Sequence, residues 1–517
     1  MPDTLMNSGT PLSVFVAQAA RRFAGRTALI HGERRWSFRE FDVQVDALAS
    51  GLRLRLAAGA RVCVFMGNRP EYLFLQAALE RANLVRVPIN ARLTALEVAA
   101  IAADCQASAL FHDAASAAML TQLATSSGPW LCPVEGAEFA ALLACPPRPD
   151  LLHQAQAEDL CSINYTSGSS GRPKGVMLTQ RNWLAVYRNM LIDRDIRGDD
   201  IVAHIGPLTH ASGTYFMPWF LRGATNVIVE NGSLDKLLEA IQTIGVTVFT
   251  CVPTVLTRLV NRDDLDRFRL GSLRAIGYGA EPIPRNTLEK ALARFGPILT
   301  QNYGLTEAMM TCITLAPEEH FAADGSLNIG ALGRAYSFVE VVLRDQDGRP
   351  VAPGEIGEIT IRSEHMMKAY WRLPEETARV LRDGWLWSGD LARMDETGFI
   401  TLAGRSKEML ISGGFNIYPQ ELEAVLTSCP LILEAAVLGV PDPDWGEIAV
   451  AFLSPAPGAE ALASEQEVAA FCKPLLGFRT PKRFLFLPSL PKNANGKVDK
   501  GRLRSSLNAG SETHEAP

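Results

Sequence analysis

A segment rich in glycine and hydroxyl side chains, ahead of a lysine, is the part of this sequence best suited to chemistry. It reads Tyr165-Thr166-Ser167-Gly168-Ser169-Ser170-Gly171-Arg172-Pro173-Lys174-Gly175 and follows a short apolar run, residues 160–164, that we expect to be a strand. Glycines let backbone N–H groups approach phosphate oxygens, hydroxyls donate further hydrogen bonds, and the lysine adds a positive charge. The segment indicates a phosphate-binding loop, although a Ser/Gly surface linker has a similar composition.

This loop differs from two well-known motifs. A Walker A loop requires Gly-Lys followed by Ser or Thr to hold magnesium, whereas Lys174 is followed by Gly175 and the glycine spacing is different. The Gly-x-Ser-x-Gly pattern of a nucleophile elbow is also missing from the segment. A phosphate loop of a third kind is therefore indicated.

Six further segments accompany the loop along the chain. They are Pro207-Leu208-Thr209-His210, Gly279-Ala280-Glu281-Pro282, Asn302-Tyr303-Gly304-Leu305-Thr306-Glu307, Ser388-Gly389-Asp390, Gly404-Arg405-Ser406-Lys407-Glu408 and Pro491-Lys492-Asn493-Ala494-Asn495-Gly496-Lys497. In this order, the seven segments resemble the motifs of the adenylate-forming superfamily, which includes acyl-CoA synthetases, nonribosomal peptide adenylation domains and beetle luciferases. Two positions depart from the pattern of many relatives: Ser388 stands where they have Thr and keeps the hydroxyl group, and Lys407 stands where they have Asp, although lysine is also common there.

The resemblance implies a site for ATP and Mg²⁺. Glu307, preceded by Thr306, would hold the metal, a role that suits a carboxylate because Mg²⁺ prefers oxygen ligands. Lys497 would be catalytic, reaching across a domain interface to the carboxylate oxygen and the α-phosphate. Tyr303 would offer a flat face to adenine, and Asp390 would accept hydrogen bonds from the ribose hydroxyls. The full set implied for ATP is Thr166, Ser167, Gly168, Ser169, Ser170, Gly171, Lys174, Gly279, Ala280, Glu281, Asn302, Tyr303, Asp390 and Arg405.

The resemblance also implies an acyl pocket and a site for coenzyme A. Its hinge residue would be Lys407, about which the C-terminal domain turns between two half reactions. The pocket residues would be His210, Ala211, Gly213, Tyr215, Tyr278, Gly304, Met309 and Met310, which predict a roomy hydrophobic slot for a fatty or aromatic acid. His210 is expected to be a pocket wall or aromatic gate, because a carboxylate ionised at pH 7 needs no general base. The coenzyme A residues would be Gly413, Gly414, Phe415, Trp445, Phe478, Arg479 and Lys482.

Several alternatives stay open within this superfamily. Transfer of the acyl group to the phosphopantetheine of a carrier protein is the alternative to coenzyme A, and luciferase-like oxidation shares the motifs. Activation of an amino acid is disfavoured, because residues 210–215 contain no carboxylate to pair with a buried ammonium group. A nucleotide-binding regulator without catalysis would be expected to lack Lys497 or Glu307, and both are present.

The elements that must position these residues are predicted from periodicity. Helical patterns at 41–54 and 71–83 alternate with apolar runs at 62–65, 226–229 and 246–251, which is typical of parallel sheets covered by helices. After Gly330, strands at 339–343, 357–361 and 399–402 alternate with turns and predict a small antiparallel sheet or barrel. A helix at 419–427 and strands at 434–440 and 449–453 follow. We expect an α/β N-terminal domain over 11–403, a mobile α+β C-terminal domain over 404–508, and poorly ordered ends at 1–10 and 509–517.

Composition narrows the class of protein further. The chain of 517 residues has 47% hydrophobic and 21% charged residues, as in ordinary globular proteins of several domains. Its formal net charge of -6 argues against nucleic-acid binding. Nine cysteines without CxxC spacing, no long apolar run and no signal pattern predict a cytoplasmic protein without an integral membrane segment. A homodimer is left open.

Overall fold

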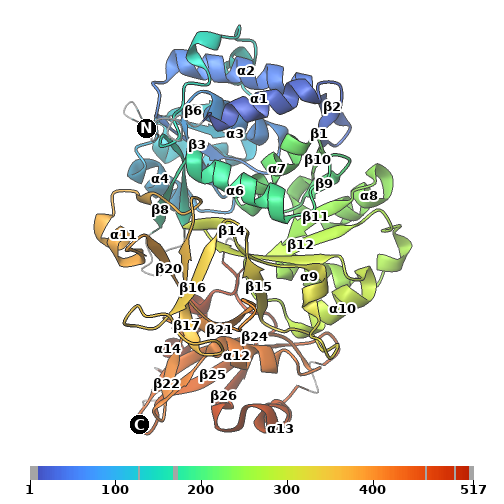
Figure 1. Ribbon diagram of the computed structural model, residues 1–517, viewed down its shortest axis with the longest axis vertical. Helices are drawn as coiled ribbons and strands as arrows, with labels where there is room; N and C mark the ends of the chain where they lie inside the picture. Colours follow the sequence, from blue (N-terminus) through green and yellow to red (C-terminus); the bar gives the residue numbers. More distant parts are fainter. Residues whose placement is uncertain (1–9, 126–127, 167–172, 460–462, 494–496, 512–517) are drawn as a thin grey trace.

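The computed structural model describes residues 10–511 except 126–127, 167–172, 460–462 and 494–496. Figure 1 shows a large body formed by the N-terminal three quarters of the chain, with a smaller unit of C-terminal residues below it. Three sheets underlie this arrangement, two of them in the body and one in the smaller unit. This confirms the predicted α/β class, with parallel sheets, an antiparallel portion and a smaller C-terminal unit.

The first sheet carries the base of the phosphate loop. Its strand order is β18-β8-β7-β4-β3-β5-β6, with parallel pairing from β6 to β7 and antiparallel pairing at β7, β8 and β18. The strands are β3 (Arg61–Phe65), β4 (Val85–Ile89), β5 (Ala109–His112), β6 (Trp130–Pro133), β7 (Leu160–Thr166), β8 (Lys174–Thr179) and β18 (Ala369–Tyr370).

Helices cover both faces of this sheet because its central strands are apolar on both sides. Val62 and Val64 of β3 pack with α2 (Phe38–Arg55) and α3 (Pro70–Arg81), while Cys63 and Phe65 pack with α4 (Ala95–Asp104). Helix α2 begins at a capping box in which Ser37 and Glu40 satisfy each other's backbone N–H groups. The helices predicted at 41–54 and 71–83 are thus confirmed with slightly earlier starts.

The second sheet joins a parallel half to an antiparallel half. Its order is β16-β17-β20-β21-β15-β14-β13-β12-β11-β9-β10-β1-β2, and β19 (Leu381–Arg382) pairs with β20. The parallel half contains β1 (Thr27–His31), β9 (Ile201–His204), β10 (Thr225–Ile228), β11 (Val248–Cys251), β12 (Ala275–Gly279) and β13 (Leu299–Leu305), with β2 (Arg34–Ser37) antiparallel at its edge. The antiparallel half contains β14 (Ala308–Leu315), β15 (Ala331–Ala335), β16 (Glu340–Arg344), β17 (Ile356–Arg362), β20 (Trp385–Met394) and β21 (Ile400–Arg405).

The parallel half of this sheet is covered by helices on both faces. Alternate residues such as Ile276 and Tyr278 pack with α8 (Leu234–Ile244), α9 (Pro253–Val260) and α10 (Arg285–Phe295). The opposite face, which includes Val202 and Val248, packs with α7 (Ala211–Arg222). The remaining helices of the body are α1 (Leu12–Arg22), α5 (Ala137–Leu143), α6 (Gln180–Asp193) and α11 (Pro374–Val380). The sites discussed below lie at the ends of these strands and on the α7 face.

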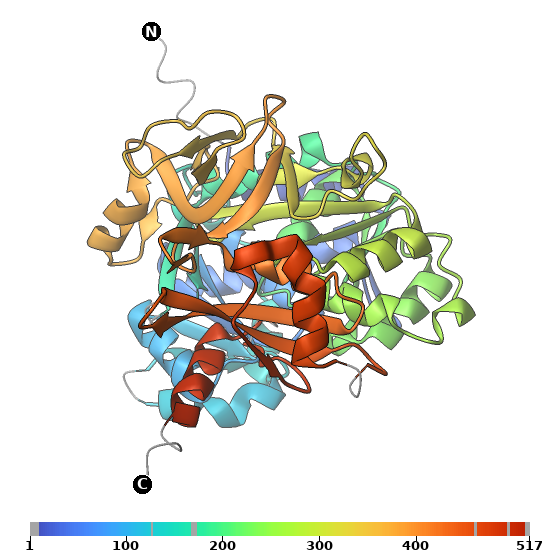
Figure 2. The same cartoon turned by 90° about the horizontal axis from the view of Figure 1, so that it is seen from below.

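The C-terminal residues form a third sheet with a core of their own. Its order is β23-β22-β25-β24, with β26 beside β25. The elements are β22 (Leu410–Ser412), β23 (Phe415–Ile417), α12 (Pro419–Leu426), β24 (Ile432–Asp442), β25 (Gly446–Pro455), α13 (Glu465–Leu476), β26 (Arg483–Phe486) and α14 (Lys500–Ser511). Two hydrophobic clusters formed by residues from 410 onward contain alternate residues of β24 and β25, such as Val437 and Ala436, and so lie on opposite faces of the sheet. Figure 2 shows this C-terminal unit, in orange to red, with its helices beside its strands. The predicted domain boundary at 403/404 stays a prediction.

The helices were compared with the length and apolar character of a membrane span. Within the described ranges, none of the helices combines the length and the apolar character needed to cross a bilayer.

Candidate functional site

Lys174 lies at the base of the glycine-rich segment, where strands β7 and β8 form a hairpin. Thr166 and Lys174 are cross-strand partners, whereas Ser167, Gly168, Ser169, Ser170 and Gly171 lie outside the described residues. The Lys174 ammonium is 2.5 Å from Glu376 Oε2 and 5.1 Å from the centre of the Tyr370 ring. The hydrogen bond from Lys174 lowers the pKa of the Glu376 carboxyl group. The lysine is therefore part of a polar cluster in which an anionic phosphate could compete with Glu376 for its charge.

Glu307 lies next to this lysine, although the two residues are far apart in sequence. The Tyr370 hydroxyl donates a hydrogen bond of 2.6 Å to Glu307 Oε1, and the Met367 N–H group donates one of 2.7 Å to the Glu307 carbonyl oxygen. Burial raises the pKa of the Tyr370 hydroxyl, and the negative charge of Glu307 raises it further. Thr306 precedes Glu307 in the turn between β13 and β14 and is partly exposed. Tyr370 thus joins Lys174 and Glu307 into one cluster.

The donor set around Glu307 bears on metal binding. Across the described parts of the chain, no three His, Cys, Asp or Glu side chains gather as a metal-binding group. Mg²⁺ is commonly held by one or two carboxylates together with substrate phosphates and water. A single carboxylate beside a phosphate-binding lysine fits that mode of binding.

Asp390 is the centre of a second polar cluster. The Tyr303 hydroxyl donates a hydrogen bond of 2.7 Å to Asp390 Oδ2, and Arg405 Nε donates one of 3.0 Å to Oδ1. Asp390 and Arg405 are cross-strand partners of β20 and β21, so the sheet register fixes this pair. Burial raises the pKa of the Tyr303 hydroxyl, and Asp390 raises it further. A carboxylate has about four acceptor positions, so Asp390 keeps the capacity to accept bonds from a diol.

Lys497 reaches this cluster from the C-terminal unit. Two hydrogen bonds join Lys497 to Asn493, from the Lys497 N–H group to Asn493 Oδ1 at 3.1 Å and from the Asn493 N–H group to the Lys497 carbonyl oxygen at 2.8 Å. Burial lowers the pKa of the Lys497 ammonium and the charge of Arg405 lowers it further, while Glu281 and Asp390 act in the opposite direction. The structure therefore brings Lys497 close to Arg405, Glu281 and Asp390, as the resemblance implies.

The turn at 279–281 is closely packed. A β-carbon on Gly279 would lie 2.2 Å from the carbonyl oxygen of Asn302, so only glycine fits at this position. Ala280 adopts a positive φ of 74°, which is uncommon for a residue with a side chain. Glu281 accepts hydrogen bonds from the Thr254 hydroxyl at 2.8 Å and from its N–H group at 3.2 Å, which caps the start of α9. Glu281 thus fixes the turn as well as facing Lys497.

The predicted acyl-pocket residues are divided between the two faces of the second sheet. Tyr278 points to the face covered by α8–α10, where its hydroxyl lies 2.9 Å from His320 Nε2. Gly277 alternates with it and faces α7. Tyr215 is buried on the α7 side, and its hydroxyl accepts a hydrogen bond of 2.9 Å from Asn302 Nδ2. The Tyr278 side chain is therefore not on the same face as Tyr215.

The other predicted pocket residues surround the start of α7 and the β13–β14 turn. His210 precedes α7 and is exposed with Ala211, whereas a β-carbon on Gly213 would meet the Leu208 carbonyl oxygen at 2.0 Å. A β-carbon on Gly304 would lie 2.6 Å from the Cα atom of Met310, whose φ is 58°, and Met309 packs against the main core. His210 and Ala211 therefore form an exposed rim at the start of α7. Gly213 and Gly304 lie where backbone segments approach each other closely, the latter beside Met310.

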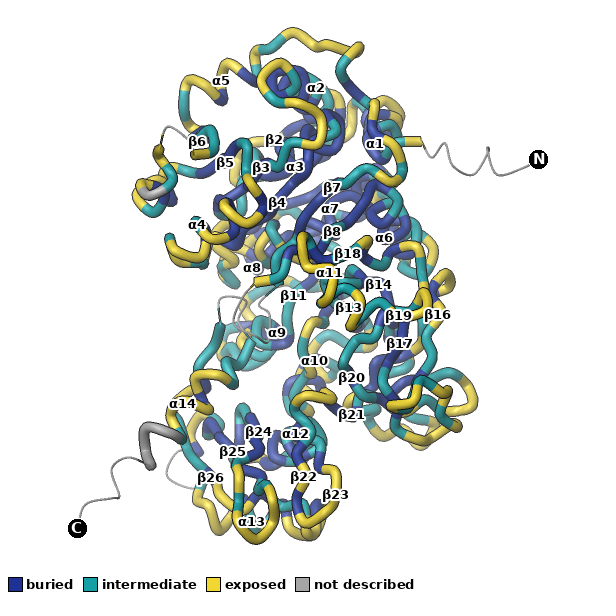
Figure 3. The backbone as a smooth tube through the Cα atoms, turned by 90° about the vertical axis from the view of Figure 1, so that its left-hand side faces the viewer, coloured by how far each residue is buried: buried dark blue, intermediate teal, exposed yellow. Residues whose placement is uncertain are grey.

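The predicted coenzyme A residues gather on one exposed surface of the C-terminal unit. The Phe415 and Phe478 rings are 4.9 Å apart, and the Lys482 ammonium lies 5.0 Å from the Trp445 ring centre. Phe415, Phe478 and Trp445 are 59%, 58% and 47% exposed. We call these four residues the aromatic face. Phe415 lies on β23 and Phe478 lies two residues after α13, and both elements are at the end of the molecule remote from the N-terminal body (Figure 3).

The remaining predicted contacts have defined positions around the aromatic face. The Gly413 N–H group donates a 2.8 Å hydrogen bond to the Trp445 carbonyl oxygen, and a β-carbon on Gly413 would lie 2.9 Å from the indole ring. Gly414 has a φ of 82°. Arg479 forms a 2.7 Å ion pair with Glu421, so its charge is partly neutralised within the domain.

Sequence reasoning missed two residues of the phosphate cluster, Tyr370 and Glu376. Tyr370 reaches the cluster because β18 pairs with β8, which places it opposite Val176. Glu376 follows on the short helix α11. No spacing rule connects residues 174, 307, 370 and 376, so only the strand pairing could have revealed their contact.

Comparisons with known proteins agree with this geometry. The profile of the family described as AMP-binding enzyme matches residues 16–371, and that of the AMP-binding enzyme C-terminal domain matches residues 421–497. A feruloyl-CoA synthase from Amycolatopsis sp. is 36% identical over 95% of this chain and 98% of its own length. Among solved structures, ATP-bound MatB from Rhodopseudomonas palustris has a TM-score of 0.87 at 28% identity, covering 96% of this chain and 99% of that one. The amide bond synthetase McbA from Marinactinospora thermotolerans has a TM-score of 0.85 at 28% identity, covering 96% and 100%.

Proposed function

The chain belongs to the AMP-binding enzyme family, and on that premise we propose that it is an AMP-forming carboxylate–CoA ligase. It converts a carboxylic acid and ATP into acyl-AMP and pyrophosphate, and then transfers the acyl group to the thiol of coenzyme A with release of AMP. The observation that carries the proposal is the position of Lys497. This residue lies in the C-terminal unit, yet it is close to Asp390, Arg405 and Glu281 of the N-terminal body.

The first half reaction brings two anions together. An oxygen of the acid attacks the α-phosphorus of ATP, and the bond to pyrophosphate breaks. Lys497 places a positive charge beside the reacting oxygens, where negative charge accumulates, and Lys174 interacts with the departing phosphates. Asp390 accepts hydrogen bonds from the ribose and so holds the nucleotide in register. The lowered pKa of Lys497 means that it loses its proton at a lower pH than an exposed lysine does.

Glu307 is the residue that would hold Mg²⁺. When bound, the metal would neutralise charge on the phosphate oxygens of ATP. Tyr370 keeps the Glu307 carboxylate in place by its 2.6 Å hydrogen bond, and the same tyrosine ring lies below the Lys174 ammonium. The metal carboxylate and the phosphate lysine are therefore positioned by one side chain.

The second half reaction needs a thiol to reach the acyl-AMP. The aromatic face supplies a surface for the pantetheine and adenine parts of coenzyme A, with Lys482 available for a phosphate group. Because this face is at the end remote from the body, it has to turn toward the ATP site. Lys407 lies between β21, which ends at Arg405, and β22, which begins at Leu410. We assign the turning point to this short connection.

An aromatic acid is the favoured substrate. The feruloyl-CoA synthase is named for an acid of this class, and it matches nearly the whole chain. The α7 face of the second sheet provides Tyr215, Tyr336 and the glycine backbone of β12, which suit a flat ring. Fatty acids are the competing class.

Carboxylate-dependent exchange of labelled pyrophosphate into ATP tests the adenylation step. We expect exchange with at least one aryl or fatty acid from a broad panel, and mass spectrometry should then find the acyl-CoA when coenzyme A is added. Folded protein that is silent with every acid would contradict the proposal. Thioester formation on a phosphopantetheinylated carrier protein, but not on coenzyme A, would show that a carrier protein is the acyl acceptor.

A further inference from the structure

The guanidinium group of Arg194 lies on the α7 face of the second sheet without a partner for one of its nitrogens. Arg194 follows the last residue of α6, and its Nη1 atom is buried with no hydrogen-bond acceptor. In the described residues, no carboxylate lies within the 4.0 Å ion-pair distance of this side chain. A charged donor left unpaired in a folded protein is costly. The structure therefore calls for an acceptor at this position.

The surroundings of Arg194 are those of the acyl pocket. Its Nη2 atom is 3.4 Å from where a β-carbon on Gly277 would lie, and its guanidinium carbon is 5.8 Å from the Tyr215 ring centre. Gly277 precedes Gly279 by two residues on β12, so Arg194 is about 7 Å deeper along the strand than the nucleotide turn. That depth is comparable to the length of an aryl acid.

The polar groups next to Arg194 are hydrogen-bonded to one another. The Tyr336 hydroxyl donates a 2.6 Å hydrogen bond to Asn302 Oδ1, and Asn302 Nδ2 donates to Tyr215. The amide of Asn302 is thus held between two tyrosines rather than turned toward the nucleotide. The Tyr336 hydroxyl oxygen also interacts with the Arg194 guanidinium group, yet Arg194 Nη1 itself has no acceptor.

A second observation comes from the first turns of α7. Ser212 Oγ is buried without a hydrogen-bond partner, and so is Gln76 Oε1, whose amide nitrogen donates a 3.2 Å bond to the Gly213 carbonyl oxygen. Buried polar atoms in native proteins nearly always have partners, which include bound molecules. These unpaired atoms add polar positions near the start of α7, close to the region for which the sequence predicts a hydrophobic slot.

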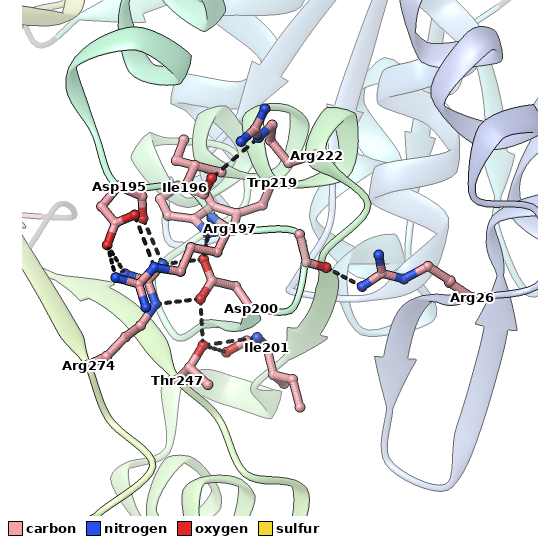
Figure 4. Close-up of polar contacts among 11 residues, drawn as sticks. Arg26, Asp195, Ile196, Arg197, Asp200, Ile201, Trp219, Arg222, Thr247 and Arg274 are labelled. Carbon is pink, nitrogen blue, oxygen red and sulfur yellow. Dashed lines mark hydrogen bonds and ion pairs between the residues drawn. The ribbon is translucent and has the colours of Figure 1, made fainter.

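The segment that carries Arg194 is held firmly (Figure 4). Asp200, which is buried, accepts hydrogen bonds of 3.0 Å from Trp219 Nε1, 2.7 Å from Arg274 Nε and 3.0 Å from the Thr247 hydroxyl. The Arg197 N–H group donates a further 2.9 Å bond to the same carboxylate. Arg274 is thus paired, a few residues from an arginine that is not. A rigid support lets Arg194 act as a preorganised recognition group.

We infer that Arg194 recognises a hydrogen-bond-accepting oxygen at the end of the substrate remote from its reacting carboxylate. The inference rests on the proposed function and names a substrate class for it, namely acids with a distal oxygen. A ring hydroxyl or methoxy group and a second carboxylate share this chemistry. The single unpaired nitrogen matches one acceptor atom, so a ring oxygen should be preferred to a second carboxylate, which favours two parallel donors.

Matched acids in the pyrophosphate exchange assay test this inference. The set is cinnamic, 4-hydroxycinnamic and 4-methoxycinnamic acid. Octanoic and suberic acid, which have the same chain length and differ by one carboxylate, test whether a second carboxylate is recognised. We expect the wild type to show at least about tenfold higher kcat/KM for the oxygenated cinnamic acids, since a polar site rejects analogues that leave its groups unpaired. Arg194→Met should lower kcat/KM for the oxygenated acids about tenfold to a hundredfold, with little change for cinnamic acid. Arg194→Lys should retain part of the preference.

The control is Arg197→Met on the same segment, because the Arg197 side chain is exposed and pairs with Asp195. It should leave the preference unchanged. Equal losses for oxygenated and plain acids in Arg194→Met, or a wild type that prefers the plain acids, would overturn the inference while leaving the proposed function intact. Arg194→Gln serves if the methionine variant does not fold, and unfolding of all three variants would show a purely structural arginine. Silence of the wild type with every acid would instead defeat the proposed function.

Discussion

The C-terminal unit presents two functional surfaces in opposite situations. Its Lys497 side chain lies near Arg405, Glu281 and Asp390 of the N-terminal body, and burial and the charge of Arg405 both lower the pKa of the lysine. Its aromatic face is remote from the body, and Phe415, Phe478 and Trp445 remain about half exposed. The difference indicates that only one of the two surfaces can face the ATP site in any one orientation of the C-terminal unit. Under the proposed function, the arrangement seen here, with Lys497 beside Asp390 and Arg405, is the one that serves adenylation.

The exposed surface is informative because large apolar side chains are seldom grouped on a protein surface without a partner. Phe415 and Phe478 contact each other, while Lys482 lies over Trp445, so the four side chains are arranged rather than scattered. Exposed apolar patches of this kind mark ligand or partner sites. Two surfaces on one domain, with one site to serve, imply alternation between them.

Replacing the buried Lys497 should impair adenylation but not thioester formation. Lys497→Ala removes a charge beside the reacting oxygens, so we expect adenylation to fall about a hundredfold to a thousandfold. Thioester formation from supplied acyl-AMP should stay within about threefold, because the aromatic face rather than the Lys497 loop serves that step. Lys473→Ala, an exposed lysine of the same unit, is the matched control. Equal loss of both half reactions would refute the assigned role.

Stiffening the connection between the two units should mainly impair thioester formation. Lys407→Pro restricts the backbone where β21 gives way to β22, so we expect thioester formation from supplied acyl-AMP to fall by more than about tenfold, with a smaller effect on adenylation. Lys407→Ala separates this backbone effect from loss of the side-chain charge, which lies near Glu376. Half reactions measured in single turnovers would show an unchanged second step if no turning occurs at this position.

Removing one ring of the aromatic face should have the smallest effect. Trp445→Ala takes away a large surface and the support for Lys482, so KM for coenzyme A should rise about tenfold, as for one or two lost contacts. Pyrophosphate exchange should be unchanged, because the exposed Trp445 side chain belongs to the aromatic face, which has no part in the proposed adenylation step. Trp385→Ala on β20, in the antiparallel half of the second sheet, controls for loss of a partly exposed tryptophan. A rise in KM for the acid instead of coenzyme A would contradict the assignment.

Much of the nucleotide site was predictable because its residues lie in short local motifs. Arg405 ends β21, Glu307 lies in the β13–β14 turn, and Asp390 lies within β20, each inside a short motif that the sequence shows directly. The helices and strands were also predictable from periodicity, to within a few residues at each end. Lys497 could be assigned only by resemblance, since its contacts cross between two units of the chain.

What could not be predicted depends on faces and long-range pairing. Tyr278 alternates to the side opposite Gly277, and only the covering helices determine which side meets the acid. Tyr370 and Glu376 reach Lys174 through the pairing of β18 with β8. Arg194 gives no sequence signal, because an arginine after a helix is usually solvated, and its missing partner appears only once its neighbours are in place.

The fate of a labelled oxygen tests the central claim most directly. The acid, labelled with ¹⁸O in both carboxylate oxygens, is converted by the wild-type enzyme with ATP and coenzyme A, and the products are analysed by mass spectrometry. Attack of the carboxylate on the α-phosphorus predicts one ¹⁸O atom in AMP and one in the acyl-CoA. Label in inorganic phosphate accompanied by ADP, or unlabelled AMP, would contradict an acyl-AMP intermediate and with it the role given to Lys497.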